Sequence, residues 1–504
     1  MKPLPAQRGE VGRRPGEGRF GRSAPHPSPL PAAPAAQGEG AILLLFLLTA
    51  GCLDVVEHGI TVGLTVRTTN CENASVIAGA TQLHLTAKSG EAVLLDRTAP
   101  IESIPRALGL PESTDAVLRV EALDATGKVL ARGTSLHFPV AVTPITQVSV
   151  QLHPVDGFSR VCATLGSARA FHTATALADG RVLLVGGQGN AGEALSSMEV
   201  LGDVEVRDVG PLALRAQGNV YRLPRAHHAA VAGNSGQVII AGGETGLALL
   251  SSVLFIDPTV DFGIGALAPQ LQLEHPTRTR HAAFRLDSKV FLLGGNTTEL
   301  GQAIANPSVA RLDLATNQLE SVSTLPSPRR DAALAQLGTL AVVAGGLELS
   351  APSARVDVVR LGSSALPAQL TLTTARTRAT AVAVGDRVLV AGGLDRRGAP
   401  LTSTEWISPG AVEPGPAITA RAEPCAVALP GGQALLVGGV GATGPSGAAE
   451  RVNADGTAVA LTFPGAARHG HACLALEDGT VLIIGGLDVA DRPLDDVWRY
   501  TPAP

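Results

Sequence analysis

The stretch Arg169–Gly187 reads RAFHTATALADGRVLLVGG, and it decides the fold. Small and apolar residues alternate in its first half, Ala178–Gly180 predicts a tight turn, and Val182–Val185 is an apolar run. An apolar run without alternation is typical of a strand that is covered on both faces. The run ends in Gly186-Gly187, which allows two backbones to approach where a Cβ atom would not fit. The stretch therefore predicts a hairpin between neighbouring sheets.

The same succession of Arg, hairpin and Gly pair occurs seven times after residue 165. The Gly pairs are Gly186-Gly187, Gly242-Gly243, Gly294-Gly295, Gly345-Gly346, Gly392-Gly393, Gly438-Gly439 and Gly485-Gly486. An Arg opens each copy, 16 or 17 residues before the first Gly, and these residues are Arg169, Arg225, Arg278, Arg329, Arg376, Arg421 and Arg468. Such self-similarity indicates a repeat architecture in which each copy is one supersecondary unit.

Each unit continues with a weaker third strand, as in Val309–Leu314, and a fourth strand, as in Leu319–Pro328. The seventh unit stops after its third strand, at the end of the chain. Phe158–Leu165, just before the first repeat Arg, has the character of a fourth strand without its first three. We expect this segment to complete the seventh unit and to close a ring.

Four strands every ~50 residues with a Gly doublet resemble the kelch repeat, which forms one blade of a β-propeller. The resemblance covers residues 158–504, and Val497–Tyr500 matches the aromatic third strand of that family. It implies an all-β protein with a seven-bladed kelch-like propeller over residues 156–504. Rigid rings of this kind bind partners through their loops, and we single out 188–197 and 394–403 as contact candidates.

Residues 53–155 contain several alternating runs, such as Ile60–Val66 and Val117–Ala122, and a hairpin signal at Asp124–Gly127. About seven short strands over this length predict a small immunoglobulin-like β-sandwich. No motif in this segment carries chemistry. We interpret it as a spacer or as an accessory binding domain.

The N-terminal 52 residues predict targeting rather than fold. Residues 1–40 are rich in Pro, Gly and Arg, which predicts disorder, and the long lead leaves a later translation start open. The apolar run in 41–52 is shorter than the ~20 residues of a membrane span, but it fits a signal-peptide core. Ala50-Gly51-Cys52 resembles the lipobox of bacterial lipoproteins. The resemblance implies lipidation of Cys52 and an outer-membrane lipoprotein that faces the periplasm or the cell surface; a plain cleaved signal or a chance Cys is the alternative.

Composition and charge exclude several classes of protein. The chain is 45% hydrophobic with 58 Gly and 35 Pro, which is too apolar for a disordered chain and too rich in Gly and Pro for a helical one. Its formal charge is −5, and the first 52 residues hold more basic than acidic residues, so the body is more negative still. We therefore predict no nucleic-acid partner. We expect a monomer.

Four Cys remain if Cys52 is lipidated. Cys71 lies in a predicted sandwich loop and Cys162 in the predicted closing strand, so a disulfide between them is one hypothesis. Cys425 and Cys473 occupy first strands of adjacent units, one register apart, which predicts side chains on opposite faces. We interpret this second pair as small core residues.

Four units carry a His three residues after the repeat Arg: His172, His228, His281 and His471. These units are consecutive around a closed ring, so four imidazoles at one mouth of a channel are a candidate ligand-binding set. The alternative is a structural role in hydrogen bonding within the repeat. The repeat Arg side chains present the same choice between binding carbonyl groups and receiving an anionic ligand. We predict no resident metal or cofactor.

No catalytic residue is predicted. The copper radical oxidases of the kelch family need two Tyr, one crosslinked to Cys, and this chain has only Tyr221 and Tyr500, with no Cys beside either in any aligned unit. Nucleophile-elbow, zinc-protease and phosphate-loop motifs are also absent. The leading hypothesis is a non-catalytic, lipid-anchored envelope protein that binds a protein, peptide or glycan. One alternative is an enzyme acting on a polysaccharide, a hydrolase, lyase or epimerase, with the four His as acid-base groups; a purely structural envelope component is the other.

Overall fold

The computed structural model describes residues 59–202, 205–216, 219–257, 271–272, 277–299, 302–363 and 367–504. They belong to one compact unit that spans Asp54–Pro504. The predicted disordered lead, the predicted signal segment and Cys52 lie outside these residues. The described chain is all-β, as predicted, with no α-helix and with two 3₁₀ turns, η1 (Ile101–Ser103) and η2 (Asn234–Gly236). No helix in it has the length and hydropathy of a membrane span.

The first hundred described residues form two sheets that share one hydrophobic core, which includes Leu83, Leu85 and Val150. The smaller sheet has the order β4 (Ala107–Leu110), β1 (Ile60–Arg67) and β8 (Gln147–Gln151). The larger sheet has the order β3 (Ala92–Pro100), β2 (Gln82–Ser89), β5 (Ser113–Leu123), β6 (Val129–Thr134) and β9 (His153–Pro154), and β7 (Phe138–Val140) pairs with β5. We call these two sheets the sandwich.

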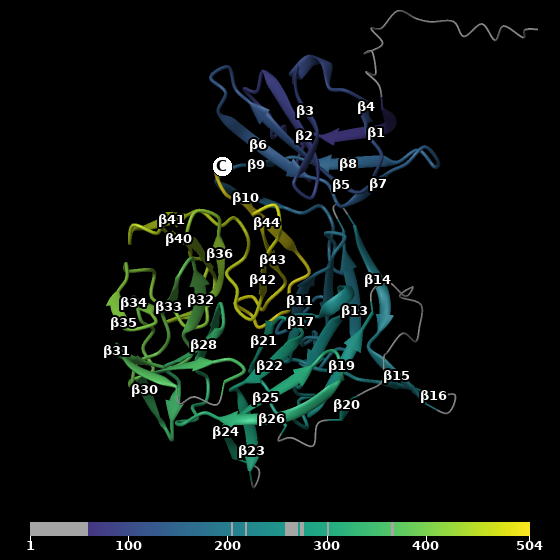
Figure 1. Ribbon diagram of the computed structural model, residues 1–504. Helices are drawn as coiled ribbons and strands as arrows, with labels where there is room; N and C mark the ends of the chain where they lie inside the picture. The colour runs from purple at the N-terminus through teal and green to yellow at the C-terminus, as the bar shows by residue number, and fades with distance from the viewer. Residues whose placement is uncertain are drawn as a thin grey trace, which may run out of the picture. The chain divides into compact units, whose positions relative to one another are not determined.

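Seven further antiparallel sheets follow, one for each repeat unit (Figure 1). Sheets 1 to 3 are β11 (Thr173–Ala176), β12 (Val182–Val185), β13 (Ser197–Leu201) and β14 (Val206–Pro211); β17 (Ala229–Ala232), β18 (Val238–Ala241), β19 (Ser252–Ile256) and β20 (Leu271–Gln272); and β21 (Ala282–Leu286), β22 (Lys289–Leu293), β25 (Ser308–Asp313) and β26 (Gln318–Thr324). Sheet 4 is β27 (Ala333–Leu337), β28 (Leu340–Ala344), β30 (Ala351–Arg360) and β31 (Ala368–Arg376), with β29 (Leu347–Glu348) also paired to β30.

Sheets 5 to 7 have the same order. They are β32 (Thr380–Val384), β33 (Arg387–Ala391), β34 (Thr404–Ser408) and β35 (Ala411–Pro414); β36 (Cys425–Leu429), β37 (Gln433–Val437), β40 (Ala449–Val452) and β41 (Ala458–Leu461); and β42 (Ala472–Ala475), β43 (Val481–Ile484), β44 (Val497–Thr501) and β10 (Gly157–Arg160). Three short hairpins extend from the repeats: β15 (Ala213–Ala216) with β16 (Asn219–Arg222), β23 (Asn296–Glu299) with β24 (Gln302–Ala305), and β38 (Val440–Gly441) with β39 (Gly444–Pro445).

The seventh sheet takes its fourth strand from the other end of the repeat region. β10 lies beside β44 (Figure 1), and the two strands pair antiparallel with Phe158 opposite Tyr500. The predicted closing segment Phe158–Leu165 therefore contributes its first residues to this sheet, and the strand ends at Arg160. The chain reaches β10 directly from β9 of the sandwich.

The first strands of the seven sheets contact one another in a closed cyclic order. β11 contacts β17, and the contacts continue through β21, β27, β32, β36 and β42 until β42 contacts β11. The cycle includes all seven repeats, so no first strand lacks a neighbour on either side.

The second strand of each sheet lies between two hydrophobic clusters, as the unbroken apolar runs predict. In β12, Leu183 and Val185 pack with Val238 and Ile240 of the next sheet. The alternate residues of β12 pack with Leu482 and Ile484 of sheet 7. All four residues of the strand are buried. Period-two side chains thus supply both interfaces of one sheet.

Two disulfides join the four Cys of the described chain. Cys71 is bonded to Cys162, which ties a sandwich loop to the segment after β10. Cys425 is bonded to Cys473, so the interpretation of this pair as separate core residues was wrong. The one-register offset puts the two side chains on opposite faces of their own sheets. Because the two sheets are neighbours, the face of one sheet that carries Cys425 packs against the face of the other that carries Cys473, and the sulfurs meet between β36 and β42.

Candidate functional site

The seven repeat Arg side chains are buried at 0 to 2% exposure, each inside its own unit. In five units the guanidinium donates to the carbonyl of the first Gly of its own pair, as Arg169 does to Gly186 at 2.8 Å. The guanidinium groups therefore do not converge on an exposed face, and the anion-receiving alternative lacks a surface. Each guanidinium instead holds the end of the second strand of its unit against the start of the first strand.

Third-strand carboxylates complete this network in five units, a feature that the sequence analysis missed. The ion pairs are Arg169–Glu199, Arg329–Asp357, Arg376–Glu405, Arg421–Glu450 and Arg468–Asp496. Glu405 also accepts hydrogen bonds from the backbone N–H groups of Thr373 and Thr374. In all five units the carboxylate lies 11 to 13 residues after the first Gly of the pair, and this nearly constant spacing was the available signal.

Units 2 and 3 have no such carboxylate among the described residues. Arg225 donates to the Ser252 hydroxyl and Arg278 to the Ser308 hydroxyl. Burial lowers the pKa of both guanidinium groups to about 10. Both groups remain charged at neutral pH, bound by neutral acceptors.

The four repeat His side chains occupy slots between neighbouring sheets. Each ring lies against the first Gly of the preceding unit: an added Cβ on Gly438 would be 2.6 Å from His471 Cε1, and one on Gly242 would be 2.8 Å from His281 Cε1. The second Gly of the unit that carries the His lies against the Cβ of that His. Each imidazole therefore lies between a Gly of the preceding unit and a Gly of its own unit, which leave room for it on both sides.

Burial makes these imidazoles neutral. The pKa values of His172, His228 and His281 lie well below 6.5, through burial first and then the nearby repeat Arg. Burial and Arg468 lower the pKa of His471 to about 3, against a weaker upward effect of the Val437 carbonyl. In the described chain, Nε2 of His228 is the one nitrogen of these four rings that makes a hydrogen bond of good geometry, with the hydroxyl of Thr173 at 2.8 Å. The enzyme alternative requires a carboxylate beside these rings, and none bonds to them in the described chain.

A different set of seven residues converges at the start of the first strands. They lie two residues after each repeat Arg, and we call them the collar: Phe171, His227, Arg280, Asp331, Arg378, Glu423 and Gly470. All seven have left-handed backbone, with φ between 48° and 62°. Such a conformation is uncommon outside Gly, and its repetition in every unit is a built feature.

Backbone hydrogen bonds connect the collar residues from unit to unit. The N–H of His227 donates to the carbonyl of Phe171, and the N–H of Phe171 donates to that of Gly470 in the seventh unit at 2.7 Å. Equivalent bonds run from Arg280 to His227 and between the residues of units 4, 5 and 6. The left-handed turn aims each N–H at the preceding unit, which is why the conformation recurs.

Collar side chains form a mixed-charge cluster. Arg378 donates two hydrogen bonds of 2.7 Å to Glu423, and Arg280 lies 4.0 Å from the same carboxylate. The Arg280 guanidinium also reaches the His227 ring at 3.2 Å, and that ring stacks on Phe171 with centroids 4.2 Å apart. The cluster therefore joins units 1, 2, 3, 5 and 6 through side chains alone.

The electrostatics of the collar follow from these contacts. Burial opposes ionisation of Glu423, but the hydrogen bonds and charge of Arg378 outweigh it, so the pKa of Glu423 is lowered. The same bonds raise the pKa of Arg378. Burial, followed by the charge of Arg280, lowers the pKa of His227 to about 3. At neutral pH the collar holds charged Arg and carboxylate groups around a neutral imidazole.

The loops between second and third strands begin beside the collar. In every unit the residue after the Gly pair bridges to the residue after the repeat Arg, as Gln188 does to Ala170 and Leu394 to Thr377. The two loops selected from the sequence, 188–197 and 394–403, start at these bridges. All seven second-to-third-strand loops therefore emerge at the same end of the first-strand cycle as the collar.

Large apolar side chains are exposed on several of these loops. Leu247 is 99% exposed, Leu349 94% and Val489 72%, and Ile304 on β24 is partly exposed. Leu349 also has left-handed backbone with φ of 57°, which is strained for a branched apolar residue. Exposed apolar side chains on loops that leave the same end of the first-strand cycle are candidate contact points for a partner. Periodicity could not reveal these residues, because a loop has no buried face.

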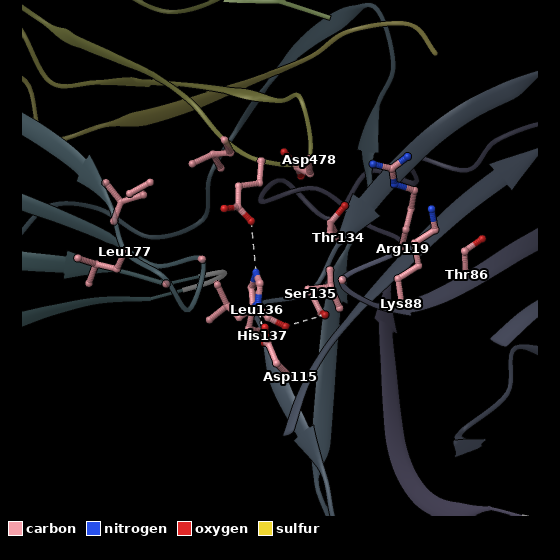
Figure 2. A pocket seen from close by; sticks show the side chains of 18 of the residues that line it. Thr86, Lys88, Asp115, Arg119, Thr134, Ser135, Leu136, His137, Leu177 and Asp478 are labelled. Carbon is pink, nitrogen blue, oxygen red and sulfur yellow. Dashed lines mark hydrogen bonds and ion pairs between the residues drawn. The ribbon is translucent and has the colours of Figure 1, made fainter. Parts of the chain in front are cut away.

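A cavity of about 620 Å³ lies between the larger sandwich sheet and repeat sheets 7 and 1 (Figure 2). His137 stands in it with Asp115 at 2.6 Å and Glu477 at 3.5 Å. The backbone N–H of His137 donates to Asp179, in the turn between β11 and β12. Each of the five carboxylates that line the cavity lies within 4 Å of a His or Arg side chain, and they are Asp96, Asp115, Glu121, Glu477 and Asp478. Of these contacts, His137–Glu477 and the His137–Asp179 backbone hydrogen bond join the sandwich to the strand ends opposite the collar, whereas the others lie within the sandwich or within sheet 7.

No protein-family model matches the sequence, and no curated protein is significantly similar to it.

Proposed function

We propose that the seven repeat sheets are the blades of a kelch-like β-propeller and that the protein is a non-catalytic recognition protein. The propeller is supported by the cyclic contacts of the first strands and by the β10–β44 pairing, which links the two ends of the repeat region. The collar hydrogen bonds support it independently, because Phe171 of unit 1 bonds to Gly470 of unit 7.

The partner is a protein or peptide that binds the face made by the collar and the second-to-third-strand loops. The observation that carries this proposal is the group of exposed apolar side chains, Leu247, Leu349 and Val489, at the ends of loops from units 2, 4 and 7. Apolar anchors around a polar, charged centre fit a protein surface. Glycan sites usually offer Trp or Tyr stacking platforms, whereas the aromatic rings of the seven collar residues are those of Phe171 and His227, which stack on each other.

The anchor belongs to the same proposal but rests on sequence alone. A lipid on Cys52 would hold the protein in the bacterial envelope, with the sandwich between the anchor and the propeller. Replacement of Cys52 by Ser should release the chain from the membrane fraction. A Cys52→Ser chain that stays in that fraction would remove the lipoprotein part of the proposal and leave the recognition part intact.

The recognition proposal is tested by selection from a displayed peptide library against the full chain. Peptides that bind the wild-type chain should lose at least about tenfold in affinity, ~1.4 kcal/mol, for a Leu247→Ser/Leu349→Ser/Val489→Ser variant. The matched control is Val142→Ser/Ile145→Ser, which removes exposed apolar residues of the sandwich, at 72% and 59% exposure, without touching the loops.

Two outcomes would overturn the choice of partner or of face. Equal peptide binding by the loop variant and the control would place recognition elsewhere on the chain. Binding of the same wild-type preparation to a glycan array, with no peptide enriched, would favour the glycan alternative.

A further inference from the structure

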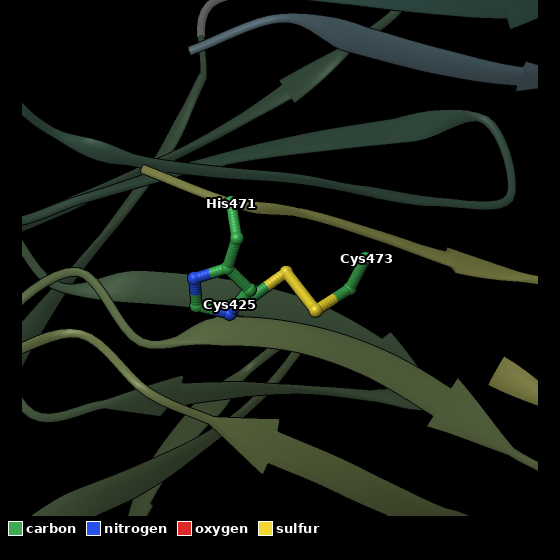
Figure 3. Close-up of side chains that lie close together, drawn as sticks. All are labelled: Cys425, His471 and Cys473. Carbon is green, nitrogen blue, oxygen red and sulfur yellow. A yellow bond between two sulfur atoms is a disulfide. The ribbon is translucent and has the colours of Figure 1, made fainter. Parts of the chain in front are cut away.

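Three metal-ligating side chains meet between repeat sheets 6 and 7. They are Cys425 at the start of β36, and His471 and Cys473 at the start of β42, and their ligand atoms lie within 4.8 Å of one another (Figure 3). The two sulfurs are joined as a disulfide, and the His471 ring lies beside it. None of the three takes part in the recognition face proposed above.

His471 has an unused coordinating group. The residue is 9% exposed, and neither ring nitrogen makes a hydrogen bond of good geometry in the described chain, although the Val437 carbonyl lies near enough to the ring to act on its pKa. The ring nitrogens of His172 and His281 are equally without partners, so the two sulfurs beside the ring are what sets His471 apart. Imidazole nitrogen and cysteine sulfur are both ligands of transition-metal ions such as Zn²⁺.

The repeat itself shows that the arrangement is particular to this slot. The residue four positions after a repeat Arg faces the His of the next unit, as the Thr173 hydroxyl does with His228. Cys425 holds that position for His471, and Cys473 comes two residues after the same His. The corresponding residues at His172 and His281 are all Ala: Ala472, Ala174, Ala229 and Ala283. Only one of the four His slots therefore holds thiol groups.

We propose that Cys425, Cys473 and His471 form a thiol-gated zinc site. Two thiolates and one imidazole are a Cys₂His set, which leaves the fourth tetrahedral position of Zn²⁺ for water or another ligand. The disulfide is the closed form, in which the sulfurs bond to each other. The dithiol is the open form, in which both sulfurs bind the metal.

The conversion is a balanced exchange with a dithiol reductant. A thiolate of the reductant attacks one sulfur, the S–S bond breaks, and the reductant leaves as its own disulfide after supplying two electrons and two protons. Zn²⁺ then displaces both thiol protons as it binds the two sulfurs. Cys425 and Cys473 are half-buried rather than sealed, so the reductant and the ion have a path to them.

The test uses the full chain, reduced without oxygen, freed of reductant and titrated with Co²⁺ as a spectroscopic probe for Zn²⁺. We expect one ion per chain, with thiolate-to-cobalt charge-transfer absorption that Zn²⁺ abolishes. The untreated chain should show none, and Cys425→Ser/Cys473→Ser should show none after reduction. His471→Ala should weaken binding at least about tenfold, ~1.4 kcal/mol, whereas His281→Ala, its match in a slot without thiols, should not.

Several outcomes would overturn the proposal. One is a reduced chain that keeps its β-sheet circular dichroism but binds no Co²⁺. Another is absorption that survives Cys425→Ser/Cys473→Ser, which would assign it to Cys71 and Cys162. Equal affinities of His471→Ala and His281→Ala would remove the imidazole from the site. A Cys425–Cys473 bond that resists reduction in the folded chain, or a chain that unfolds on reduction, would show that the folded protein has no dithiol form that can bind the metal.

Discussion

The guanidinium of Arg280 lies 4.0 Å from the carboxylate of Glu423, although the two residues come from the third and sixth repeat units. No sheet contains both residues, and they meet only because the collar brings seven left-handed turns to one place. Arg378 of unit 5 holds the same carboxylate with two hydrogen bonds. One carboxylate thus connects three units through side chains.

Replacement of Glu423 by Gln should lower the free energy of unfolding at pH 7 by about 0.5 to 1 kcal/mol, because the ion pairs are partly exposed. The folded pKa of Glu423 is lowered, so its contribution is present above its unfolded pKa of ~4.3 and is lost as pH falls through the folded value. Wild type and variant should therefore converge below about pH 4 in urea titrations. A difference that does not change with pH would show that the carboxylate charge is not involved.

Gly392 and Gly398 form a matched pair within unit 5. Both have positive φ, 62° and 75°, but a Cβ on Gly392 would lie 2.2 Å from the carbonyl oxygen of Arg421, whereas one on Gly398 would meet nothing within 4 Å. Gly398→Ala should cost about 1 kcal/mol for the backbone conformation alone, and Gly392→Ala more than ~3 kcal/mol. Urea midpoints measure both. Equal costs would mean that the neighbouring unit can move away from the Gly pair.

The repeat Arg residues should differ in importance according to their partners. Arg376→Met leaves Glu405 buried without its cation, and we expect a loss of about 3 to 5 kcal/mol. Arg225→Met leaves only a carbonyl and a hydroxyl without a donor, and we expect about 1 to 3 kcal/mol. Guanidinium chloride unfolding of the two variants compares them directly. A larger loss for Arg225→Met would contradict the role of the third-strand carboxylates.

His281 should make the protein sensitive to mild acid. Its folded pKa lies well below 6.5 through burial and then Arg278, so protons bind preferentially to the unfolded chain as pH falls below 6.5. His281→Ala should lose stability at pH 8 because it leaves a cavity, yet the gap to wild type should shrink between pH 6.5 and 5. The expected change is about 1.4 kcal/mol per pH unit. A constant gap over this range would mean that the imidazole is charged in the folded chain.

The amino-acid sequence by itself determined the periodic part of the protein. The repeat Arg, the apolar runs and the Gly pairs are local, and each recurs because every unit must pack on two neighbours, so the hairpins and the buried second strands could be read from one unit. The role of Phe158–Leu165 followed from counting strands, and the structure pairs the first residues of this segment with β44.

Only the tertiary structure decided which residues from different units meet. Cys425 and Cys473 point to opposite faces of their own sheets and still bond, because adjacent sheets turn those faces toward each other. The collar could not be predicted from the sequence, because its seven side chains share no chemistry and have only a backbone conformation in common. A repeat fixes the position of each residue within its unit, whereas contacts between units depend on how all seven first strands pack against one another, which no single unit encodes.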